Sequence, residues 1–93
     1  MTTTGQHLQE ASEEAIETTP EIYQRFGNSV RTVRRAKNIT QAQLAKAASM
    51  NKTYLVRIES GDKNVTLKTA QKIALALDVE LVTLLKGVKL TVV

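Results

Sequence analysis

The chain has 93 residues, a formal net charge of +4, no cysteine and a single histidine. This length allows one domain of ordinary globular composition, whose core would bury about two thirds of the unfolded chain's surface. Without cysteine, disulfides and thiolate metal sites are excluded, and His7 has no co-ligands in its polar stretch, so no metal or other cofactor is expected.

From the sequence we expect neither a membrane-spanning segment nor a signal peptide. A spanning helix needs about 18 to 20 apolar residues, and residues 1–14 lack the basic and apolar regions of a leader. We therefore expect a cytoplasmic protein without a membrane partner.

Charge is distributed unevenly along the sequence. The only charged residues before Arg25 are five glutamates, whereas from residue 22 onward thirteen basic residues face four acidic ones, a net charge of +9. Such a surplus on a small domain favours a polyanionic partner, although many domains are simply basic.

Residues 1–19 are rich in Thr, Glu, Gln and Ser, which predicts a flexible acidic arm. Thr19 and Pro20 then match the N-cap and first position of a helix. This first helix is expected from Glu21 to about Lys37, because apolar residues recur at helical spacing among basic ones. They are Ile22, Phe26, Val30 and Val33.

Two short helices joined by a tight turn are predicted next. Thr40 lies three residues before Gln43, a capping-box arrangement that predicts a helix from Gln41 to about Ala48. Asn51 can cap a third helix from Lys52 to about Ser60, which Gly61 would end in a left-handed conformation. Met50, Leu55 and Ile58 are expected to anchor this helix in the core, and its outward positions are Lys52, Thr53, Tyr54, Val56 and Arg57.

Thr66 is expected to cap a fourth helix, from Leu67 to about Leu77. Its inward face would carry Leu67, Ala70, Ile73, Ala74 and Leu77. A fifth, short helix is expected at about residues 80–86, and residues 88–93 alternate as a β-strand does. The predicted fold class is all-α, with five helices over residues 20–86 and a short C-terminal β-strand or dimerisation tail at 87–93.

The segment ITQAQLAKAASMNKTYLVRIESG resembles the phage repressor and Cro-type helix-turn-helix family, through its glutamine, its Leu-Ala pair and its Ile-Glu-x-Gly ending. VRTVRRAKN upstream and VTLKTAQKIALALDV downstream extend the resemblance to about residues 22–86. It implies a compact, repressor-like DNA-binding domain whose third helix enters the major groove. Relatives include xenobiotic response element-type regulators, restriction-modification controller proteins and antitoxin repressors. One departure is Ser49, where the family usually has glycine: either this serine adopts a left-handed backbone, or the turn differs slightly.

The resemblance also implies roles for individual residues. Base contacts fall to Lys52, Thr53 and Arg57, with Val56 as a further candidate. DNA backbone contacts fall to Gln41, Tyr54, Lys63 and Asn64, and Gln41 would also brace the third helix. Arg34 and Glu59 match an internal ion pair that orients this helix. For Arg31 and Arg35, a DNA contact and a solvated surface position both remain open.

The apolar C-terminal residues exceed what one small domain is expected to bury, so we interpret part of them as a homodimer interface, with intramolecular packing as the alternative. They are Leu81, Leu84, Leu85, Val88, Leu90 and Val92.

The function predicted is that of a sequence-specific double-stranded DNA-binding transcriptional regulator, a repressor acting as a homodimer on a palindromic operator. The alternative is an antitoxin that binds a toxin protein and represses its own operon. An enzyme is disfavoured, because the sequence offers no convergent set of acid, base or nucleophilic residues.

Overall fold

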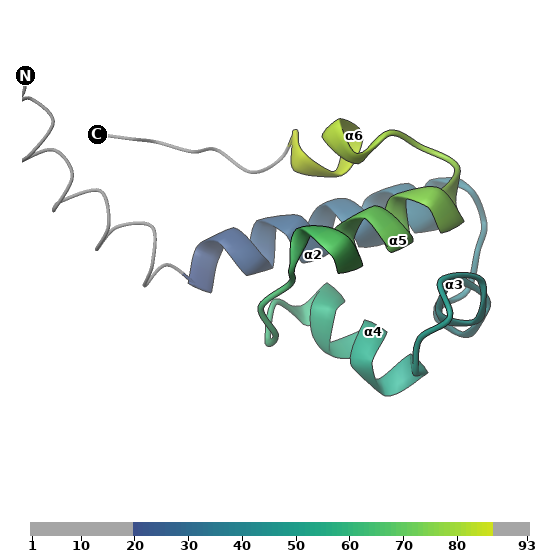
Figure 1. The fold of residues 1–93 in the computed structure, drawn as a ribbon, viewed down its shortest axis with the longest axis horizontal. Helices are drawn as coiled ribbons and strands as arrows, with labels where there is room; N and C mark the ends of the chain where they lie inside the picture. Colours follow the sequence, from purple (N-terminus) through teal and green to yellow (C-terminus); the bar gives the residue numbers. More distant parts are fainter. Residues whose placement is uncertain (1–19, 87–93) are drawn as a thin grey trace, which may run out of the picture.

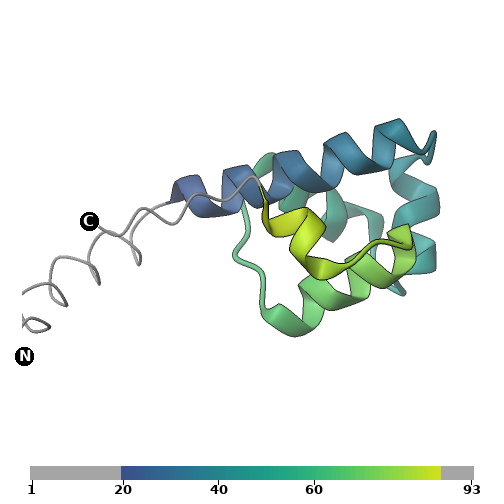
Figure 2. The same cartoon turned by 90° about the horizontal axis from the view of Figure 1, so that it is seen from above.

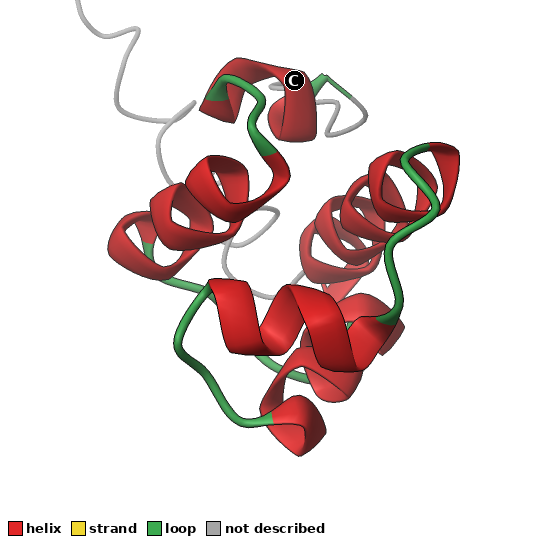
Figure 3. Ribbon diagram, turned by 90° about the vertical axis from the view of Figure 1, so that its right-hand side faces the viewer, coloured by secondary structure: helices red, strands yellow, loops and turns green. Residues whose placement is uncertain are grey.

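The computed structural model describes residues 20–86, and within this range the chain forms five α-helices joined by short loops (Figures 1 and 3). The arm predicted for residues 1–19 and the strand or tail predicted for residues 87–93 lie outside the described residues. The described helices are α2 (Pro20–Ala36), α3 (Gln41–Ala47), α4 (Lys52–Ser60), α5 (Leu67–Leu77) and α6 (Leu81–Leu85).

The long helix α2 runs through the middle of the fold. In Figure 1, α4 lies below α2 and α6 above it, and seen from above, α6 lies across both α2 and α5 (Figure 2). Phe26 and Val30 of α2 are buried in a core to which all five described helices contribute. The buried members of this core are Phe26, Val30, Leu44, Ala45, Leu55, Ile58, Ala70, Ile73, Ala74, Leu77 and Leu84.

Side-chain caps define the starts of the three middle helices. The hydroxyl of Thr40 accepts a hydrogen bond from the backbone N–H of Gln43 (3.0 Å), and the Gln43 side chain accepts one from the N–H of Thr40 (2.8 Å). Asn51 caps α4 through the N–H of Thr53, and Thr66 caps α5. These bonds satisfy N–H groups that lack partners within the helix. The bounds predicted for α4 and α5 and the predicted start of α3 are confirmed, and the other predicted helix ends differ by one residue.

Among residues 20–86, three non-glycine residues have a left-handed backbone, and each follows a helix. Ser49 has φ 55°, so the first of the two options for the turn between α3 and α4 is correct. Asn38 (φ 58°) and Asp78 (φ 59°) were not predicted in this conformation, although Asn and Asp adopt it more readily than most residues. Gly61 ends α4 at φ 79°, as predicted.

The structure corrects two expectations about burial. Leu67 was expected to face inward, but it is 72% exposed. At 100° per residue it lies about 70° from the middle of the face formed by Ala70, Ile73, Ala74 and Leu77, outside the buried arc. Leu84 was expected at a dimer interface, but it is fully buried in the core of its own chain. It is therefore unavailable to a second copy.

The remaining apolar residues of α6 are only partly covered. Leu81 packs against the core, whereas Leu85 is 37% exposed. Val88, Leu90 and Val92, also predicted at the interface, lie outside the described residues. Among the described helices, none has the length and apolar character needed to cross a membrane.

Candidate nucleic-acid interface

Helices α3 and α4 form a helix-turn-helix. The turn between them is fixed by backbone hydrogen bonds from Ser49 to Lys46 (3.0 Å) and from Met50 to Ala45 (2.9 Å). Ala45 is buried, and Met50 is partly buried against the core. The turn therefore holds α4 at a fixed angle to α3, with the N-terminus of α4 beside α3 (Figure 1).

Helix α4 has two chemically different sides. Leu55, Ile58 and Glu59 are buried. The four residues predicted to contact bases are all exposed and follow one another at spacings of one, three and one residues, which places them in one stripe along the helix. They are Lys52, Thr53, Val56 and Arg57, and we call them the α4 stripe.

The residues predicted to contact the DNA backbone lie near both ends of α4. Gln41 is the first residue of α3, and its side-chain amide donates to Glu59 Oε1 (3.0 Å), a direct brace between α3 and α4. After α4, the Lys63 ammonium lies 5.5 Å from the centre of the Tyr54 ring. Asn64 is exposed in the same loop. Figure 1 shows α3 at one end of α4 and this loop at the other.

Arg57 lies beside Asp62, a contact that was not predicted from the sequence. Its Nε lies 3.4 Å from a carboxylate oxygen of Asp62, with both side chains at least half exposed. An exposed pair of this kind contributes little to stability, because solvent screens it. Arg57 can therefore exchange this contact for one to DNA at small cost.

Glu59 lies at the centre of a buried polar cluster. Its side chain is 1% exposed and accepts two hydrogen bonds from Arg34, at 2.6 Å and 3.0 Å. Arg34 also donates to the carbonyl of Ile39 (2.9 Å). Arg31 Nε lies 3.8 Å from the same carboxylate. The predicted partners Arg34 and Glu59 are thus in contact, and the cluster connects α2, α3 and α4.

These neighbours set the pKa of Glu59. Burial acts to raise it, but hydrogen bonds from Arg34 and Gln41 and the positive charges of Arg34 and Arg31 outweigh burial, so the pKa lies below its ordinary value. The folded protein therefore holds this carboxylate in its ionised form more strongly than the unfolded chain does.

We expect this difference to make stability depend on pH. The stabilisation by ionised Glu59 is complete above the unfolded-state pKa of about 4.5 and is lost as the pH falls through the lower folded-state value. Urea unfolding at a series of pH values should show the free energy of unfolding falling over this range less steeply in Glu59→Gln than in the native chain. Identical slopes for the two proteins would contradict this assignment.

Gly27 allows α2 and α4 to approach closely. A Cβ atom on Gly27 would lie 2.6 Å from the Glu59 carbonyl oxygen and closer still to that of Ile58. Both oxygens belong to the last turn of α4. This contact was not predicted from the sequence. The one local signal was a glycine within a predicted helix, where it costs about 1 kcal/mol relative to alanine.

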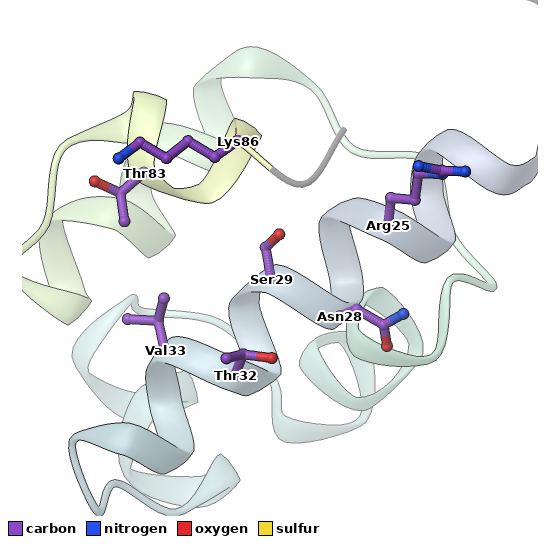
Figure 4. Close-up of a pocket in the computed structure, with 7 residues that line it drawn as sticks. All are labelled: Arg25, Asn28, Ser29, Thr32, Val33, Thr83 and Lys86. Atoms are coloured by element: carbon purple, nitrogen blue, oxygen red, sulfur yellow. The ribbon is translucent and has the colours of Figure 1, made fainter. Parts of the chain in front are cut away.

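A separate open groove of about 300 Å³ lies between α2 and α6 (Figure 4). Thr83 and Lys86 line it from α6, and the α2 residues are mostly polar. In Figure 1, α6 and α4 lie on different sides of α2, so this groove is distinct from the α4 stripe. The α2 residues that line it are Arg25, Asn28, Ser29, Thr32 and Val33.

Comparison with known proteins agrees with this geometry. Residues 30–84 match the helix-turn-helix family model, so the chain belongs to this family. It is a DNA-binding transcriptional regulator with the five-helix fold predicted from the sequence.

Particular relatives are found among control proteins and phage repressors. The control protein C.BamHI of Bacillus amyloliquefaciens is 41% identical over 56 residues, covering 59% of this chain and 69% of the relative. The immunity repressor of Bacillus phage phi105 is 33% identical over 54 residues, covering 58% of this chain and 38% of the repressor. The crystal structure of the restriction-modification controller protein C.AhdI from Aeromonas hydrophila superposes with a TM-score of 0.65 and 35% identity, covering 67% of this chain and 94% of that one.

Proposed function

We propose that this protein is a repressor that binds a palindromic operator as a homodimer, with α4 in the major groove and residues 20–86 as its DNA-binding domain. The observation that carries the proposal is the α4 stripe, exposed on a helix whose other side is anchored in the core. The names of its relatives, control proteins and an immunity repressor, support regulation of transcription and favour it over the antitoxin alternative. Such a protein acts where duplex DNA is found, in the cytoplasm.

The α4 stripe offers the chemistry that base edges require. Lys52 and Arg57 donate hydrogen bonds to acceptors such as guanine O6 and N7. Thr53 and Val56 carry methyl groups that pack against the methyl of thymine. Donors and methyl groups on one stripe together discriminate between base pairs, which a uniformly basic surface does not.

Contacts near the two ends of α4 would fix its register on the duplex. At the start of α3, backbone N–H groups that have no partner within the helix can bind a phosphate next to Gln41, whose side chain is engaged with Glu59. Tyr54 in the first turn of α4, together with Lys63 and Asn64 in the loop after this helix, can bind a second phosphate. The contact between Lys63 and the Tyr54 ring favours this arrangement of the loop.

The homodimer is supported by apolar side chains left exposed near the C-terminal end of the described chain. Leu75 of α5 is 68% exposed, and Val82 and Leu85 of α6 are 54% and 37% exposed. Together with the partly buried Leu81, they are apolar positions that a second copy can cover. Two-fold symmetry would then place the half-sites one helical turn apart, roughly 34 Å.

The proposal predicts different outcomes for Arg57→Ala and Lys63→Ala. Arg57→Ala should cost about 1 to 3 kcal/mol of binding free energy at one operator position and relax discrimination there. Lys63→Ala should weaken binding to all duplexes alike and reduce the salt slope by about 0.9, the value for one phosphate contact. Binding titrations against operator variants at several salt concentrations measure both effects.

Lys72→Ala serves as the control, because Lys72 is exposed on α5 and belongs to neither proposed group of DNA contacts. It should leave affinity and discrimination nearly unchanged. If Arg57→Ala and Lys63→Ala proved equally insensitive to sequence, the assignment of Arg57 to base contact would be wrong.

A further inference from the structure

Arg31 makes contacts that differ from both positions predicted for it from the sequence, a DNA contact and a solvated surface position. Its Nη2 donates a hydrogen bond to the main-chain carbonyl of Glu59 (3.0 Å), and its Nε lies 3.8 Å from the carboxylate of the same residue. The side chain is about one-third exposed (34%). Arg31 is therefore neither simply solvated nor free to turn toward DNA without losing these contacts.

The carbonyl that Arg31 binds lies at the C-terminal end of α4. Carbonyls in the last turn of a helix lack partners within it and carry the negative end of the helix dipole. In α4, the carbonyls of Arg57 and Ile58 accept from the backbone N–H groups of Asp62 and Gly61. The guanidinium of Arg31 supplies both a donor and a positive charge at the next carbonyl along, that of Glu59.

We propose that Arg31 is a positioning residue for DNA recognition, which sets the orientation of α4 without touching DNA. This inference rests on the proposed function of the α4 stripe. Arg34 binds the carboxylate of Glu59, at the end of a side chain with several rotatable bonds. Arg31 binds its main chain. The two contacts together restrain rotation of α4 about its own axis, and this rotation decides which side chains of the stripe meet the bases.

Close packing of α2 against α4 supports the contact between Arg31 and Glu59. Gly27 and Arg31 are one helical turn apart on α2, and the absence of a side chain at Gly27 brings the α2 backbone against the last turn of α4. Arg31 can therefore reach the Glu59 carbonyl. The contact with the Glu59 carbonyl distinguishes Arg31 from Arg35, which is exposed on α2 and has the same charge.

The test compares Arg31→Gln with Arg35→Gln in the full-length chain. Both variants remove one positive charge from α2, so their difference reports the contact with α4. Dissociation constants are measured for a duplex selected by the native protein and for a scrambled duplex, at several salt concentrations and at a temperature where circular dichroism shows each protein folded. Arg31→Lys is included because it keeps the charge and one donor.

We expect Arg31→Gln to weaken binding to the selected duplex about 10-fold more than Arg35→Gln does, since hydrogen bonds to charged groups are the stronger ones. Its preference for the selected over the scrambled duplex should fall by a similar factor, with the salt slope equal to that of Arg35→Gln. Arg31→Lys should recover part of the preference, and it also provides the comparison with native protein if Arg31→Gln does not fold.

Three results would overturn the inference. One is a salt slope for Arg31→Gln that is smaller by about 0.9 with both duplexes weakened equally, which identifies a phosphate contact. The second is an Arg31→Gln variant that binds like Arg35→Gln. The third is an Arg31→Lys variant that keeps the full native preference although its contact with Glu59 is lost. If the native protein itself showed no preference between duplexes, the proposed function would fail first.

Discussion

Replacing Arg34 with alanine is expected to lower the free energy of unfolding by about 3 kcal/mol, because it removes two short hydrogen bonds from a carboxylate that stays buried. Breaking a buried ion pair typically costs about 3 to 5 kcal/mol. We expect the lower end of this range because Gln41 and Arg31 remain near the Glu59 carboxylate in the variant. The loss is a large part of the about 5 to 15 kcal/mol that stabilises a domain.

Urea unfolding followed by circular dichroism measures this effect. Arg35→Ala is the matched control: it removes the same charge one residue away, at an exposed position, and should change stability by less than about 0.5 kcal/mol. The double variant Arg34→Met with Glu59→Leu should recover much of the loss, since apolar residues replace the pair without a stranded charge. Equal stabilities for Arg34→Ala and Arg35→Ala would show that the buried cluster does not hold α4 in place.

Gly27→Ala is expected to destabilise the protein by about 1 to 3 kcal/mol, although alanine is the better helix former. The added methyl group would meet the carbonyl oxygens of Ile58 and Glu59, which are backbone atoms and cannot turn aside. Helix α2 or α4 must therefore move. Because the displaced residues belong to the last turn of α4, binding to the selected duplex should weaken as well.

The comparison for Gly27→Ala is Asn28→Ala, on the exposed side of the same helix. Asn28 already carries a Cβ, so this replacement removes only an exposed carboxamide, and stability should stay within about 0.5 kcal/mol of the native value. Thermal unfolding and duplex titration of both variants give the two readouts. A Gly27→Ala protein as stable as Asn28→Ala would mean that α2 and α4 are farther apart than described.

Local signals were enough to predict most of the helices. Thr40, Asn51 and Thr66 cap helices through bonds to residues two or three positions away, so the information lies within a few neighbouring residues. The left-handed Gly61 is a signal of the same kind. The burial of Leu84 and the exposure of Leu67 depend instead on which helices meet. Periodicity placed Leu67 on the inward face of its helix, and the number of apolar residues in the C-terminal stretch placed Leu84 at a dimer interface.

The residues of the candidate site also fall into those that could be predicted from the sequence and those that could not. The exposed positions of α4 follow from helical spacing, and family resemblance indicated Arg34 and Glu59 as partners. By contrast, the contacts of Arg31 with Glu59 join residues 28 positions apart, and no local pattern distinguishes Arg31 from Arg35. The proximity of Asp62 to Arg57 likewise depends on the path of the chain after Gly61.

Base readout by the α4 stripe can be tested by selecting duplexes with native protein from a random pool, followed by competition against unselected DNA at moderate salt. We expect enrichment of one sequence with two-fold symmetry, bound at least about 1,000-fold more tightly than unselected DNA. Enrichment of no sequence, with equal affinity for all duplexes, would contradict the claim that the α4 stripe contacts base edges.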